Sequence, residues 1–158
     1  MSDQKRDLEM NALKKFRLIY GAVKSHFKEI EKLCGVSSSQ LWILKIVREH
    51  PGIGVTDVAK KLAIHQTTAS ILVEKLAKKN LIQKTRSLED QRRIVLFVDA
   101  KGVEILSKAP DAVEGLLPHA LSNLSESSLN QLDHDLELII KQFDSKFFNL
   151  ADIPLAEL

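Results

Sequence analysis

The sequence predicts a mainly α-helical fold that contains one small β-hairpin, and three observations support this prediction. Apolar residues recur every three to four positions over residues 8–34, as on one face of a helix. Two short amphipathic segments, 55–62 and 66–80, are separated by only three residues. A run rich in β-branched residues, 93–99, follows a polar turn.

The composition is that of an ordinary globular protein of one domain. The chain has 158 residues, of which 44% are hydrophobic and 28% charged. No apolar run approaches the roughly 20 residues that a membrane span needs, and the charged N-terminus is unlike a signal peptide. The single cysteine, Cys34, cannot form an internal disulfide, which suggests a reducing compartment. We therefore expect a cytoplasmic protein that does not associate with membranes.

The charge is distributed unevenly along the chain. The net formal charge is +2 overall, but residues 1–50 carry +4, residues 51–101 carry +5 and residues 102–158 carry −7. A basic central segment suggests that it binds a polyanion. The alternative is a coincidence of solvated faces.

The first helix is predicted from a stripe of apolar residues and a clear stop. Gly35 ends this helix, and the serines at 37–39 can cap a second helix over residues 40–50. Pro51 and Gly52 end the second helix. The stripe on the first helix consists of Phe16, Tyr20, Val23, Phe27, Ile30 and Cys34.

The middle of the chain predicts a helix-turn-helix. The short helix 55–62 carries Asp57 in its first turn, and residues 63–65 form the turn. The second helix follows and ends near Asn80. Its inward face is predicted to consist of Ala69, Leu72, Val73 and Leu76. Two short helices around a three-residue turn are typical of this motif.

A hairpin follows directly and has the position of a wing. Residues 81–86 and 93–99 read as strands, and residues 87–92 read as their loop. We therefore predict a winged helix-turn-helix over residues 36–101.

The C-terminal part is predicted to be helical again. A helix begins near Asp99, and Pro110 should break it after Ala109. Ser125 or Ser127 can cap the last helix, whose apolar stripe consists of Leu129, Leu132, Leu136, Ile139, Phe143 and Phe147. The terminal stripes are longer than the central unit can cover. We expect residues 1–35 and 102–158 to form a helical dimerisation unit in one compact chain, or, alternatively, to fold over the core of a monomer.

The order of elements resembles the MarR family of bacterial transcription regulators. The wing, from Asp90-Gln91-Arg92 to Gly102, is similar to the family's Asp-x-Arg pattern, and residues 50–82 are similar to its helix-turn-helix. The chain departs from the family at Gly54, where a capping Thr is common, and at His65, where Ser or Asp is usual. Ile71 and Asp99 also differ from the usual residues.

Several residues are candidates for contacts with double-stranded DNA. In a recognition helix the outward residues of the first turns reach base edges. This predicts base contacts for Gln66, Thr67 and Ser70, a phosphate contact for Thr68 and a thymine-methyl contact for Ile71. Lys75 is a candidate for a phosphate, or is simply solvated.

The resemblance assigns the most important role to the wing tip. It implies that Arg92 enters the minor groove and that Asp90 braces it by charge-assisted hydrogen bonds. Arg86 and Arg93 lie nearby and are predicted to hold phosphates. The alternative for Arg92 is a surface ion pair of little energetic consequence.

The resemblance also implies a regulated homodimer. Family members commonly respond to small aromatic or amphipathic acids, and Phe16, Tyr20, Trp42 and Ile46 could line a pocket for one or could simply be core. Some members sense peroxides through a cysteine, but Cys34 continues an apolar stripe and is better explained as a packed thiol. The histidines show no metal-ligand spacing, so we predict no metal and no cofactor.

These observations favour one function among three. The chain lacks a Gly-rich phosphate loop, a metal cluster and a Gly-x-Ser-x-Gly elbow, so an enzyme is not expected. A winged-helix module that binds protein is the second reading. The first is a homodimeric regulator, a repressor relieved by an effector, that binds a pseudo-palindromic operator and associates with the nucleoid.

Overall fold

The computed structural model describes residues 2–158 and shows a mainly α-helical chain with one two-stranded antiparallel hairpin. The elements are α1 (Asp3–Cys34), α2 (Ser38–Glu49), α3 (Val55–Leu62), α4 (Gln66–Lys78), β1 (Ile82–Arg86), β2 (Ile94–Val98), α5 (Ala100–Lys108), α6 (Leu116–Ser122), α7 (Glu126–Ile140), and the 3-10 helices η1 (Ser145–Asp152) and η2 (Leu155–Glu157). The predicted fold class is therefore confirmed.

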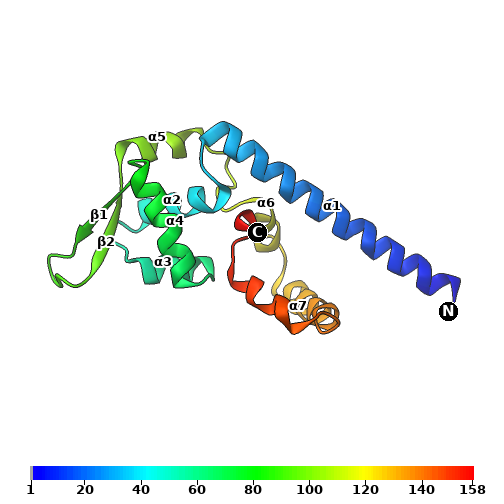
Figure 1. Ribbon diagram of the computed structural model, residues 1–158. Helices are drawn as coiled ribbons and strands as arrows, with labels where there is room; N and C mark the ends of the chain where they lie inside the picture. Colours follow the sequence, from blue (N-terminus) through cyan, green and yellow to red (C-terminus); the bar gives the residue numbers. More distant parts are fainter. Residues whose placement is uncertain (1) are drawn as a thin grey trace.

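The chain is arranged around a core built from the central elements (Figure 1). The hairpin lies at one end of the molecule, and the free N-terminal end of α1 lies at the other. Helices α2, α3 and α4 pack together beside the hairpin, whereas α7 and the C-terminal segment lie below α1. The largest fully buried side chains come mainly from α2, α4 and β2, among them Leu41, Ile43, Leu44, Leu72, Leu76 and Leu96.

The local signals for helix ends act as predicted. Gly35 ends α1 in a left-handed conformation, with φ of 70°. Ser37 caps α2 through a capping box with Gln40, and Asp99 caps α5. Helix α5 ends at Lys108, just before Pro110, because proline cannot continue the hydrogen-bond ladder. Gly54 begins α3 without a side-chain cap, which agrees with the departure noted in the sequence.

The last helix is shorter than its apolar stripe predicted. Helix α7 ends at Ile140, so Phe143 and Phe147 lie outside it. The reason is Asp144, whose carboxylate accepts a hydrogen bond from the backbone N–H of Lys146 and begins η1. Apolar residues continue at intervals of four across the boundary, at Phe143 and Phe147, so their spacing alone predicted a longer helix, although a 3-10 helix aligns only residues three apart.

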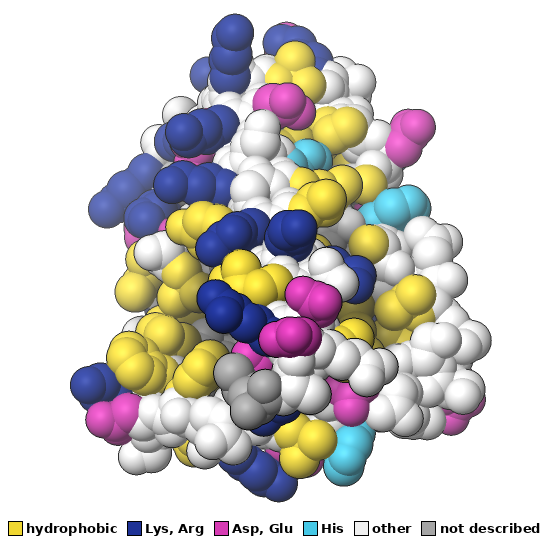
Figure 2. All heavy atoms as spheres, turned by 90° about the vertical axis from the view of Figure 1, so that its right-hand side faces the viewer, with side chains coloured by type: hydrophobic (Ala, Val, Ile, Leu, Met, Phe, Trp, Pro, Cys, Tyr) yellow, Lys and Arg dark blue, Asp and Glu magenta, His cyan; other side chains and the backbone are white. Residues whose placement is uncertain are grey.

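The first helix extends beyond the core. Ile30 and Cys34 are buried, but the same stripe nearer the N-terminus is exposed, with Phe16 at 44% and Tyr20 at 69% exposure. Figure 2 shows hydrophobic side chains on the face turned toward this end, beside gathered Lys and Arg side chains. The protomer therefore leaves a large apolar surface open to solvent.

Helix α5 approaches the hairpin closely at Gly102, which is buried. A Cβ added there would clash with the Leu81 carbonyl oxygen and lie 2.7 Å from Cγ1 of Val98. We expect Gly102→Ala to lower the free energy of unfolding by about 1–3 kcal/mol through overpacking. Thermal and urea unfolding measure this change.

Gly21→Ala is the matched control for this substitution. Apart from its chain neighbours and the backbone of its own helical turns, no atom of residues 2–158 lies within 4 Å of a Cβ added at Gly21 in α1, so alanine there should stabilise the protein by up to about 1 kcal/mol. A Gly102→Ala protein as stable as the wild type would contradict the close approach.

Candidate nucleic-acid interface

Helix α4 has one buried and one exposed face. The residues predicted to face inward are all buried, namely Ala69, Leu72, Val73 and Leu76. The predicted DNA contacts lie on the other face, where Gln66, Thr67, Ser70, Ile71 and Lys75 are exposed and Thr68 is half-buried. The free face of α4 is therefore polar at its N-terminal end, with Ile71 as an exposed apolar residue.

The tip of the hairpin is a turn held by short-range hydrogen bonds. The hydroxyl of Ser87 accepts from the backbone N–H groups of Glu89 and Asp90, at 3.2 and 3.3 Å. The Asp90 carboxylate accepts from the backbone N–H of Arg92 at 2.9 Å. Asp90 thus holds Arg92 through its backbone, rather than through the guanidinium as the sequence suggested.

The hairpin is also fixed to the start of α3. The backbone N–H of Leu96 donates to the carbonyl of Ile53, and Gly52 donates to Leu96, both at 2.9 Å. The Arg93 guanidinium lies 3.2 Å from the Asp57 carboxylate of α3. These contacts set the position of the hairpin relative to the two helices of the motif.

The tip of the hairpin and the N-terminal half of α4 line one groove of about 660 Å³. Five of the ten predicted DNA contacts meet there, namely Gln66, Ser70, Asp90, Arg92 and Arg93. The groove is open, and its charged lining consists of three cations, Lys84, Arg92 and Arg93, and two carboxylates, Asp57 and Asp90. Such a groove suits a phosphate backbone.

The three wing arginines differ in what they contact. Arg93 pairs with Asp57, and the Arg86 guanidinium donates to the carbonyl of Gln91 at 3.1 Å. Within residues 2–158, the guanidinium of Arg92 makes no hydrogen bond or ion pair with the protein. Arg92 is therefore the arginine of the tip whose charge is available to a partner.

Two further residues belong to the groove and were missed in the sequence. Lys84 of β1 lies 2.7 Å from the Glu74 carboxylate of α4 and lowers the pKa of that carboxyl. Thr56, in the first turn of α3, lines the same groove. The alternation of residues along the strand could have predicted that Lys84 points outward. Nothing in the sequence could have predicted that Thr56 lines the groove.

The remaining predicted contacts lie outside this groove. Thr67, Thr68 and Ile71 of α4 and Arg86 of β1 do not line it, and Lys75 lines a different hollow beside Gly35. Their roles stay predictions.

A second cleft, of about 470 Å³, lies between α1, α2, α6 and the C-terminal segment. Its walls are mainly apolar and include Phe27, Trp42, Ile64, Leu117 and Ile153. Of the four residues that the sequence suggested for an effector pocket, only Trp42 lines this cleft. Phe16 and Tyr20 are exposed on α1, and Ile46 is buried in the core, so the structure does not bring the four together.

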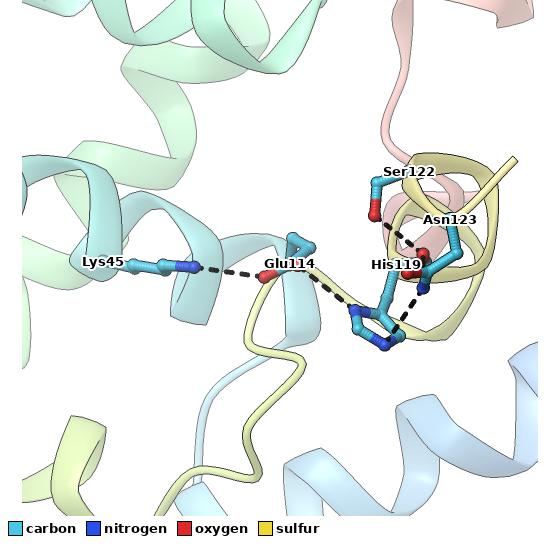
Figure 3. A network of polar contacts seen from close by, with 5 residues as sticks. All are labelled: Lys45, Glu114, His119, Ser122 and Asn123. Atoms are coloured by element: carbon cyan, nitrogen blue, oxygen red, sulfur yellow. Dashed lines mark hydrogen bonds and ion pairs between the residues drawn. The ribbon is translucent and has the colours of Figure 1, made fainter. Parts of the chain in front are cut away.

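The polar edge of this cleft is centred on Glu114 (Figure 3). Its carboxylate accepts from Nζ of Lys45 at 3.2 Å and lies 3.8 Å from Nδ1 of His119. Ser122 and Asn123 donate to the carbonyl of His119, at 2.8 and 2.9 Å. This network attaches the loop before α6 to α2.

The contacts of Glu114 make stability depend on pH. A hydrogen bond from its own backbone N–H, followed by that from Lys45, holds the pKa of this carboxyl below its ordinary value of 4.5 despite partial burial. The stabilisation is therefore present above pH 4.5 and is lost as the pH falls through the folded-state pKa. We expect Glu114→Gln to lower Tm by about 2–4 °C at pH 7, corresponding to about 1 kcal/mol.

The same difference in Tm should shrink as the pH falls below 4.5. Thermal unfolding from pH 7 to pH 3 measures it. Glu104→Gln, on an exposed i,i+4 pair with Lys108, is the control and should change Tm little at any pH. A constant difference at every pH would contradict the assignment.

Cys34 is a buried thiol rather than a sensor. Its exposed fraction is 7%, and burial raises its pKa, although Lys108 acts in the opposite direction. A raised pKa keeps the sulfur protonated at neutral pH, and the thiol is less reactive than the thiolate. The redox alternative is therefore not favoured.

Residues 2–158 contain neither a cluster of three metal-ligating side chains nor a helix long and apolar enough to cross a membrane.

Comparisons with known proteins agree with this architecture. Residues 36–94 match the family model described as the MarR family. The regulator MgrA of Staphylococcus aureus is 26% identical over 147 residues, which cover 91% of this chain and 97% of that protein. The homoprotocatechuate degradative operon repressor of Escherichia coli is 23% identical over 133 residues, covering 84% and 88%. The repressor MdtR of Bacillus subtilis is 25% identical over 100 residues, which cover 63% of this chain and 64% of MdtR.

Solved structures show the same fold. The complex of S. aureus MepR with DNA has a TM-score of 0.58 at 21% identity, covering 82% of this chain and 96% of MepR. The regulator BldR of Sulfolobus solfataricus has a TM-score of 0.56 at 23% identity, covering 90% and 100%. These relatives are named as transcriptional regulators, in agreement with the prediction that the chain is not an enzyme. Residues 36–94 thus match the MarR family model, and the chain is similar over most of its length to proteins named as transcriptional regulators.

Proposed function

We propose that this chain is a sequence-specific regulator that binds double-stranded operator DNA as a homodimer. The observation that carries the proposal is the groove that Gln66 and Ser70 of α4 line together with Arg92 of the wing, whose guanidinium pairs with no group of residues 2–158. In this proposal α4 reads the major groove and Arg92 enters the adjacent minor groove, where negative potential is concentrated. Thr67, Thr68 and Ile71 complete the contacts of α4, and Lys75, Arg86 and Arg93 contact phosphates.

The distribution of charge and of exposed apolar surface assigns DNA binding and dimerisation to different parts of the chain. Residues 36–101 bind DNA, whereas residues 1–35 and 102–158 form the dimer. The exposed apolar face of α1 supports this division, because it has the character of an uncovered interface. A two-fold dimer presents two reading heads to half-sites about one DNA turn apart, so the operator is pseudo-palindromic.

The direction of regulation is proposed from the relatives. Two of them are named as repressors, MdtR and the homoprotocatechuate operon repressor. We propose that this chain also represses, and that it acts in the cytoplasm in association with the nucleoid.

An effector would bind in the cleft that Trp42 lines. None of the described residues that line the cleft is Lys, Arg or His, and one of them is Glu114. This lining favours a neutral or cationic apolar molecule over the aromatic or amphipathic acid expected from the family resemblance. Trp42 is the single tryptophan of the chain, so quenching of its fluorescence reports binding without a label.

The test of DNA binding uses the promoter upstream of the protein's own gene. Fluorescence anisotropy at two salt concentrations should show specific binding that weakens steeply as salt rises, because Lys and Arg release counterions from the phosphates. A chain that binds no duplex DNA even at low salt would contradict the proposal. That result would favour the alternative, a winged-helix module that binds protein.

A further inference from the structure

The helix that carries the proposed base contacts begins without a capping side chain. His65 is the N-cap residue of α4, and its side chain makes no hydrogen bond to the first turn. Ser, Thr, Asp or Asn at such a position accepts a hydrogen bond from that turn, and losing the cap typically costs about fivefold in the local folding equilibrium. Something else must hold this end of α4.

The C-terminal segment reaches this helix end. The backbone N–H of His65 donates to the carbonyl of Asp152 at 3.1 Å. The imidazole Nε2 of His65 lies 3.3 Å from the Asp152 carboxylate. This carboxylate therefore lies near the N-terminus of α4, where a negative charge is favourable to the helix dipole.

The same segment is anchored at two further points. Ile153 and Pro154 line the cleft against Trp42 of α2. The carboxylate of Glu157 accepts a hydrogen bond from the hydroxyl of Ser37, the N-cap of α2, at 2.9 Å. Residues 152–157 thus connect the N-termini of α2 and α4, and Figure 1 shows the segment running back from α7 toward α6.

We propose that residues 152–157, here called the strap, position the proposed recognition helix, and that Asp152 is a positioning residue for DNA binding. This inference rests on the proposed role of α4 in reading DNA. The strap holds the turn that contains Gln66 and Thr67, so it fixes the angle at which these side chains leave the protein. Because the strap follows α7 and walls the cleft, a ligand that displaces it releases the same turn.

The direction in which DNA affinity changes distinguishes a positioning role of the strap from an effect of its negative charge alone. Asp152 and Glu157 are negative, so removing them would strengthen binding to DNA if only charge mattered. If the strap positions α4, their removal weakens binding to the operator while binding to random duplex stays equal or becomes tighter. The His65–Asp152 pair is about half exposed and contributes little alone, so the test removes the side-chain contacts of Asp152, Ile153 and Glu157 together.

The strap variant combines Asp152→Ala, Ile153→Ser and Glu157→Ala in the full-length chain. The control combines Asp133→Ala and Asp135→Ala on the exposed face of α7, which removes the same number of charges. Hydrogen exchange of amides 69–71, the first amides of α4 that have acceptors within the helix, should accelerate about fivefold in the strap variant of the free protein, as expected for loss of a cap, and should not change in the control. Operator affinity should fall about fivefold in the strap variant alone.

A rescue distinguishes this local effect from general destabilisation. Adding His65→Ser gives α4 its own cap and should restore the slow exchange of residues 69–71 in the strap variant. Unchanged exchange in the strap variant, or operator binding as tight as in the control, overturns the inference. If the wild type binds no duplex DNA, the proposed function fails, and the exchange measurement still decides whether the strap holds α4.

Discussion

Arg92→Ala lowers operator affinity by about tenfold to a hundredfold, the largest loss that we expect from one wing residue. The reason is that the guanidinium of Arg92 is held at the tip through its backbone and makes no hydrogen bond or ion pair with residues 2–158. Its interaction with DNA therefore replaces no contact within the protein. Fluorescence anisotropy with operator and random duplexes measures both affinity and specificity.

Two variants serve as controls for Arg92. Lys14→Ala removes the same charge from the exposed part of α1, the helix whose N-terminal end lies away from the wing (Figure 1), and should change affinity less than twofold to threefold. Arg93→Ala should have an intermediate effect, because Arg93 already pairs with Asp57. Equal losses in all three proteins would mean that net charge alone governs binding.

Phe16→Asp converts the proposed dimer into a monomer. Phe16 lies on the exposed apolar face of α1, and a carboxylate buried there in an interface would have no partner. We expect the dimer Kd to rise at least about a hundredfold, as for a hot-spot residue. Sedimentation velocity over a range of protein concentrations measures this change.

Leu18→Asp is the matched control on the same helix. Leu18 follows two residues later, about 200° around the helix axis, and is 71% exposed. It should remain dimeric. If both variants are dimeric, the apolar face of α1 is not the interface; if both are monomeric, the effect is one of charge on α1 in general.

The helix-turn-helix could be predicted well because its signals are local. The spacing of Ala69, Leu72, Val73 and Leu76 defines one helix face, and all four are buried. Gly35, Asp99 and Pro110 marked helix ends for stereochemical reasons that act within a few residues. The end of α7 was misplaced because the apolar spacing continues through the 3-10 segment beyond Asp144.

The sites were harder to predict because their contacts join distant parts of the chain. The Arg93–Asp57 pair connects the wing to α3, and the His65–Asp152 pair connects α4 to the C-terminal segment. No pattern among residues close together in the sequence predicts pairs between residues so far apart. Periodicity also cannot say which surface covers an apolar stripe, so Phe16 and Tyr20 could be assigned to a pocket although they lie exposed on α1.

If the proposed dimer forms through α1, the exposed half of this helix would link the regulator's response to the concentration of the chain in the cell. The 32-residue helix that projects from its core would then gain much of its stability from a second chain, so folding and pairing would become a single equilibrium. The population of paired chains then rises with the square of the chain concentration when pairing is weak. Repression would therefore switch on over a narrow range of expression level, and a modest fall in synthesis would release the operator without any effector.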